Sequence, residues 1–97
     1  NLYNFAAAAQ KKADLRALVE EIDIGGPCLL RASAKNFHSL VVLPAVKHYP
    51  ELMRIMRERD NRVPLDFRKR MAEETFALTS AYDRMISAAL TETALQS

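Results

Sequence analysis

The two glycines of this 97-residue chain are adjacent, at positions 25 and 26. All the backbone freedom that glycine supplies is therefore concentrated at one point. Pro27 follows at once, and proline suits the first position of a helix, where its missing N–H group costs nothing. The sequence thus predicts a tight turn at Gly25 and Gly26 that leads into a helix over residues 27–36.

The start of this helix is predicted to bind a small anionic molecule. Exposed N–H groups and the positive end of the helix dipole meet there, and glycine lets a ligand approach the main chain closely. Asp23 lies just before the turn and Lys35 near the far end of the helix. On spacing alone, Asp23 is equally well explained as a helix cap or stop, and Lys35 is better explained as a lysine favoured by the dipole.

Apolar periodicity divides the rest of the chain into helices and one strand. Apolar residues three and four apart predict an amphipathic helix over residues 12–22, and the short apolar run at residues 40–43 predicts a buried parallel strand. Further helices are predicted from near Pro50 to residue 59, after a separate turn at 44–49, and over residues 65–91, after a loop at 60–64. The predicted buried face of the last helix consists of Phe67, Met71, Leu78, Tyr82, Met85 and Leu90, with the Tyr82 hydroxyl hydrogen-bonded.

Composition argues against several classes of partner. The 14 basic and 12 acidic residues are interspersed and give a net charge of +2, so a nucleic-acid partner is not expected. The single cysteine, Cys28, cannot form an internal disulfide, which favours a cytoplasmic protein. No apolar run is long enough to cross a bilayer, so no membrane partner is expected. His38 and His48 lie on different predicted elements, so no metal site is expected.

Three separate motifs resemble one enzyme family. Residues 22–36 read IDIGGPCLLRASAKN, residues 1–5 read NLYNF, and residues 79–83 read TSAYD. They are similar to IDIGG followed by LLRAAAKN, NLYPF and TAxYD in the cyclohydrolase half of the bifunctional AICAR transformylase/IMP cyclohydrolase family. The resemblance covers essentially all 97 residues. The departures, at Asn4, Ser33 and Phe37, remove no chemically active group.

This resemblance implies an α/β fold. The chain would be the C-terminal part of a methylglyoxal-synthase-like domain, which is Rossmann-like with a parallel sheet. Residues 1–97 would form the C-terminal portion of a single cyclohydrolase domain whose upstream phosphate-binding half is absent, and the chain itself would be mostly helical with one or two short strands. Residues 1–3 would be the tail of one strand. A homodimer is expected from the family and fits the marginal size of the chain.

The resemblance also implies an activity. The family's cyclohydrolase is a hydrolase of purine biosynthesis that closes formylated AICAR to IMP with loss of water, and it needs no cofactor or metal. Its substrate is a small purine nucleotide. Carried over by position, Lys35 is the proton donor and acceptor, Asp23 orients the substrate amide or its partner lysine, and Tyr3 is an active-site residue. The predicted substrate contacts are Asn1, Asp23 and the backbone N–H groups of Ile24 and Gly25.

Two other functions stay open at this stage. The chain would bind nucleotide poorly if no other polypeptide supplied the phosphate-binding loops, so one alternative is a non-catalytic helical module for dimerisation or interaction. A nucleotide-sensing regulatory domain of the methylglyoxal-synthase type is a weaker alternative, because sensing would not require both Asp23 and Lys35.

Overall fold

The computed structural model describes residues 3–10, 14–93 and 95. In this part of the chain the structure is helical and contains no β-strand. The elements in chain order are α1 (Tyr3–Gln10), α2 (Leu15–Glu20), α3 (Gly25–Lys35), the short 3-10 helix η1 (Val46–His48), α4 (Tyr49–Glu58) and α5 (Leu65–Glu92).

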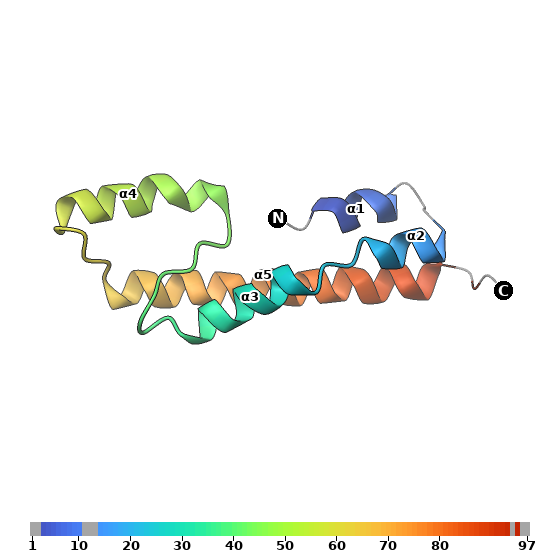
Figure 1. The fold of residues 1–97 in the computed structure, drawn as a ribbon. Helices are drawn as coiled ribbons and strands as arrows, with labels where there is room; N and C mark the ends of the chain where they lie inside the picture. Colours follow the sequence, from blue (N-terminus) through green and yellow to red (C-terminus); the bar gives the residue numbers. More distant parts are fainter. Residues whose placement is uncertain (1–2, 11–13, 94, 96–97) are drawn as a thin grey trace.

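The long helix α5 is the spine of the molecule. The other helices lie along it, with α4 near its N-terminal end and α1 and α2 near its C-terminal half (Figure 1). The molecule measures 58 × 22 × 17 Å and has a radius of gyration of 16.7 Å, whereas a compact domain of this length would have about 12.5 Å. Such an elongated shape leaves room for only small cores.

Two separate apolar clusters pack against α5. The first joins α3, α4 and the N-terminal half of α5, and its buried members are Ala34, Val42, Ile55, Phe67, Met71 and Ala72. The second joins α1, α2 and the C-terminal half of α5 through Phe5, Leu18 and Tyr82. In that cluster the rings of Phe5 and Tyr82 meet edge to face, with their centroids 5.9 Å apart.

Helix α3 runs antiparallel to α5, and a polar contact joins the two segments near each end of α3. The Asp23 N–H donates a hydrogen bond of 2.9 Å to the Tyr82 hydroxyl. At the other end, Arg68 Nη1 donates one of 3.1 Å to the carbonyl of Phe37 and another to the carbonyl of His38. Because fourteen residues separate both Asp23 from Phe37 and Arg68 from Tyr82, the two contacts share one antiparallel register.

The predicted α/β fold with a parallel sheet is wrong for the described residues. Residues 40–43 form an irregular segment, and Val42 is buried in the first cluster, where neighbouring apolar residues of the segment pack around it. A strand needs a neighbouring strand for its hydrogen bonds, and the segment has helices beside it instead. The apolar run therefore predicted burial correctly and strand pairing incorrectly. Tyr3 begins α1 instead of ending a strand, and Asn1 lies outside the described residues.

Most of the predicted helices are confirmed. Pro50 lies in the first turn of α4, just after η1, where proline is tolerated. Helix α2 is shorter than the predicted 12–22 segment: Asp14 caps it by accepting a 2.8 Å hydrogen bond from the Ala17 N–H. On α5, Phe67, Met71 and Tyr82 are buried as predicted and Met85 is half-buried. Leu78 and Leu90 are 36% and 39% exposed, so their predicted burial is wrong.

Candidate functional site: the segment from Asp23 to Lys35

Asp23 lies between α2 and α3 and is held in place by two hydrogen bonds. Its side-chain Oδ1 accepts a bond of 2.8 Å from the Gly26 N–H, and its own N–H donates to the Tyr82 hydroxyl. The first bond is that of a helix-capping aspartate, three residues before its donor. It occupies only one of the two carboxylate oxygens, and no described residue donates a hydrogen bond to Oδ2. The half-buried Asp23 is thus fixed in its main chain and retains one available oxygen.

The glycine pair is not the predicted tight turn. Gly25 and Gly26 are the first two residues of α3, and neither has a positive φ. A Cβ atom on Gly26 would lie 2.5 Å from Asp23 Oδ2, so any other residue at this position would displace the capping carboxylate. A Cβ atom on Gly25 would meet nothing within 4 Å. Packing within the described chain therefore explains Gly26 and leaves the bare surface at Gly25 unexplained.

The main chain beside Gly25 offers hydrogen-bond donors. No described residue accepts a hydrogen bond from the N–H of Ile24 or Gly25, as is usual for the first turn of a helix. Both residues are exposed, Ile24 to 70%. An external oxygen atom could accept from this pair, with the Asp23 carboxylate close by in the chain.

Lys35 lies at the opposite end of α3. It is the last residue of the helix, it is exposed, and no described residue forms an ion pair with it. At 1.5 Å per residue, the two ends of α3 are about 15 Å apart. The described residues therefore do not bring Lys35 and Asp23 together. Helical side chains tilt toward the N-terminus, which directs Lys35 back along α3.

The other predicted site residues lie at the start of the chain. Asn1 lies outside the described residues. Tyr3 is the first residue of α1, and its side chain also lies outside the described part of the structure. Their roles in substrate binding and catalysis therefore stay predictions.

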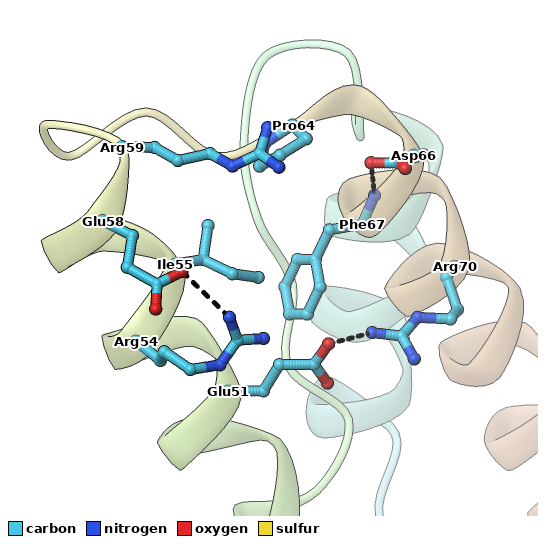
Figure 2. A pocket seen from close by; sticks show the side chains of 9 residues that line it. All are labelled: Glu51, Arg54, Ile55, Glu58, Arg59, Pro64, Asp66, Phe67 and Arg70. Carbon is cyan, nitrogen blue, oxygen red and sulfur yellow. Dashed lines mark hydrogen bonds and ion pairs between the residues drawn. The ribbon is translucent and has the colours of Figure 1, made fainter.

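The structure has a hollow elsewhere, between α4 and α5. It has a volume of about 430 Å³ and contains none of the predicted site residues. Three arginines and three carboxylates line it, and two of the arginines are paired: Arg54 with Glu58 at 3.0 Å and Arg70 with Glu51 at 2.7 Å (Figure 2). Because the lining charges balance, this hollow offers no net attraction for an anionic ligand.

Two residues of α5, Tyr82 and Arg68, hydrogen-bond to the main chain on either side of α3, and neither was predicted to belong to the site. Tyr82 was predicted as a core residue with a bonded hydroxyl, and this is confirmed: it is 2% exposed. Its partner, the Asp23 main chain 59 residues away, has no local signal in the sequence. The same holds for Arg68 and the carbonyls that follow α3.

The described residues contain neither a metal-ligand cluster nor a membrane-spanning helix. In residues 3–10, 14–93 and 95, no three His, Cys, Asp or Glu side chains are grouped as a metal site would require. Within the same residues, no helix has the length and apolar character needed to span a bilayer.

Comparison with known proteins places the chain in a family. The family model of the AICARFT/IMPCHase bienzyme matches residues 33–97, which include Lys35 and Tyr82. The bifunctional purine biosynthesis protein PurH of Microcystis aeruginosa is 46% identical over 89 residues, 91% of this chain and 17% of that protein. The PurH protein of Dinoroseobacter shibae is 40% identical over 92 residues, 95% of this chain and 17% of that protein. This chain thus spans about a sixth of the relatives' length, and it belongs to the AICARFT/IMPCHase bienzyme family.

Proposed function

We propose that this chain carries part of the active site of an IMP cyclohydrolase, which closes formylated AICAR to IMP with loss of water. The observation that carries the proposal is the environment of Asp23: a fixed carboxylate with one available oxygen, followed by two exposed N–H donors and a glycine with open space around it. Membership of a family whose relatives are named as bifunctional purine biosynthesis proteins supports the same reading.

Ring closure joins two groups of one molecule. The carboxamide nitrogen attacks the formyl carbon, and the amide loses a proton as the carbonyl oxygen gains negative charge. Holding the two groups at reacting distance supplies much of the acceleration in such a reaction. Asp23 would accept a hydrogen bond from the carboxamide through Oδ2 and so orient its nitrogen toward the formyl carbon. Its capping bond and its bond to Tyr82 support this role, because they restrict where the carboxylate lies.

The backbone donors would stabilise the developing charge. The N–H groups of Ile24 and Gly25 would donate to the oxygen of the former formyl group during attack. The bare Gly25 surface would let that oxygen approach the main chain. The exposed Ile24 side chain would offer an apolar surface to the purine base.

Lys35 would move the protons. As the predicted general acid and base, it would carry to the former formyl oxygen the proton that the carboxamide nitrogen loses. The formamide nitrogen then loses its proton as well, the C=N bond of the ring forms, and the oxygen, now carrying both protons, leaves as water. Lys35 is exposed at the C-terminal end of α3, and this supports contact between its amine and a ligand bound outside the helix. The substrate would then lie along α3. Because the two ends of this helix are about 15 Å apart, farther than a lysine side chain extends, water would relay the proton between Lys35 and the oxygen held by Ile24 and Gly25. Tyr3 and Asn1 remain proposed contacts at the same site.

The remaining proposals concern partners. The ligand would be a small purine nucleotide, the protein a homodimer, and its compartment the cytoplasm. The elongated shape supports a partner chain, because large apolar side chains are left uncovered on it: Leu29 and Val46 are 70% and 74% exposed. The exposed single cysteine supports a reducing compartment.

A turnover assay tests the proposal. The intact protein is incubated with formylated AICAR, and the formation of IMP is followed by its ultraviolet absorbance. Turnover that is lost when Lys35 is replaced supports the proposal. A protein that binds the nucleotide without turnover supports the second candidate, a non-catalytic module. The separation of Lys35 from Asp23 within the described residues is the observation that favours this second candidate.

A further inference from the structure

We infer that Tyr82 is a positioning residue for Asp23, acting across 59 residues of sequence through its hydroxyl. The inference rests on the proposed function, because it concerns the residue that would orient the substrate amide. Helix α5 would then contribute to the candidate site as well as to the apolar core.

The Tyr82 hydroxyl has a specific partner. The ring is 2% exposed and packs against Phe5 and Leu18, which fixes its position in the second cluster. Its oxygen lies 2.9 Å from the Asp23 nitrogen. Tyrosine is thus used where phenylalanine would fill the same apolar space, and the added atom serves the main chain of Asp23. Buried hydroxyls usually need a partner, but this partner is the residue with the available carboxylate oxygen.

The hydrogen bond to Tyr82 restricts a movement of Asp23 that the capping bond allows. The capping bond from Gly26 joins Asp23 only to its own helix, so α3 and the carboxylate could shift together relative to the rest of the protein. The bond to Tyr82 joins the same residue to α5, the spine of the fold. Arg68 joins the segment after Lys35 to α5 in the same register. The main chain at both ends of α3 is therefore hydrogen-bonded to one helix, α5.

A double-mutant cycle tests the inference on the intact protein. Tyr82→Phe removes the hydroxyl and keeps the ring. Asp23→Asn keeps an oxygen that caps α3 but removes the carboxylate. If Tyr82 acts through Asp23, Y82F lowers kcat by about tenfold, because a misplaced carboxylate loses much of its orienting effect. KM should change little, because the backbone donors that bind the substrate remain in place. Added to D23N, the same change then lowers kcat no further.

Amide hydrogen exchange provides the structural readout. In Y82F the Asp23 N–H should exchange faster, because its acceptor is gone. Thr79→Val is the matched control: it removes another buried hydroxyl of α5, whose only described bond is to the Phe76 carbonyl one turn earlier. T79V should leave both the Asp23 exchange rate and kcat unchanged.

The outcomes separate the inference from the proposed function. A Y82F effect on kcat that multiplies with that of D23N overturns the inference, since general destabilisation would act in this way. An unchanged Asp23 exchange rate, or an unchanged kcat in a protein that turns over, also overturns it and leaves the proposed function intact. A wild-type protein without turnover overturns the proposed function, and the inference with it.

Discussion

The two ends of α3 differ in how firmly the fold holds the candidate site residue found there. At the N-terminal end, Asp23 is half-buried and bound both to its own helix and to α5. At the C-terminal end, Arg68 binds the carbonyls beyond the helix, and Lys35 itself is exposed. The fold thus positions a carboxylate in advance and leaves an amine free to move. Such a division suits a carboxylate that orients a ligand and a lysine that reaches it from solvent.

The largest effect expected is that of Lys35→Met. Loss of the proposed general acid and base should lower turnover by about 10²–10⁴-fold. Because the side chain is exposed, the free energy of unfolding should stay within about 0.5 kcal/mol of wild type. Steady-state assays with formylated AICAR and denaturant unfolding measure the two quantities. Lys47→Met removes another exposed lysine, on η1, and should affect neither. Equal activity of K35M and wild type would contradict the assigned role.

Asp23→Asn tests the other end of the comparison. Asparagine caps a helix about as well as aspartate, so stability should hardly change, whereas turnover should fall by about 10²-fold through loss of the orienting charge. Asp14 provides a matched control, because it caps α2 with the same geometry and no ligand is proposed there. If D23N and D14N behave alike, both residues are caps and nothing more.

Arg68→Met should loosen the end of α3 that carries Lys35. Hydrogen bonds from a charged group contribute about 1.5–3 kcal/mol, and the variant loses those to the Phe37 and His38 carbonyls. Chemical denaturation should show this loss of stability. Hydrogen exchange should show faster opening after residue 35 with little change at Asp23. Equal loosening of both ends would mean that α3 moves as one rigid piece and that its ends are not held separately.

Gly26→Ala should be destabilising by about 1–2 kcal/mol. The new methyl group would lie 2.5 Å from Asp23 Oδ2, so the carboxylate must move and the cap is lost. The midpoint of thermal unfolding should fall, and turnover should fall with it because Asp23 is displaced. A stable and fully active G26A protein would show that the cap is dispensable.

The neighbouring Gly25→Ala gives the smallest effect, with the opposite sign on stability. Its methyl group meets nothing in the described chain, and alanine is the better helix residue, so the protein should become more stable by about 0.5–1 kcal/mol. Turnover should nevertheless fall, because the methyl group would obstruct a ligand at the main chain. A G25A protein with greater stability and undiminished turnover would place the ligand elsewhere.

The sequence predicted the helices better than the sheet. Pro50, Pro64 and the spacing of Phe67, Met71 and Tyr82 are local signals, so they located α4, the loop before α5 and much of its buried face. The apolar run at residues 40–43 predicted burial, but buried helices and buried strands both contain such runs. Only the arrangement of neighbouring elements decides whether such a run pairs with another strand, and in the described residues helices lie beside it.

The candidate site shows the same limit. The alternative prediction that Asp23 caps the helix is confirmed, but the motifs did not reveal that Gly26 makes room for this cap or that Gly25 lies in open space. The predicted tight turn was wrong because the capping carboxylate lets the helix begin two residues earlier than proline placement indicates.

The sequence by itself determined where helices form and end, which family the motifs resemble, and which residue types are available for chemistry, because each of these depends on neighbours along the chain. The tertiary structure alone decided that Tyr82 holds Asp23, that Arg68 holds the far end of α3, and that Lys35 stands apart from both. These relations depend on the antiparallel register of α3 and α5, which is set by the packing of side chains far apart in sequence.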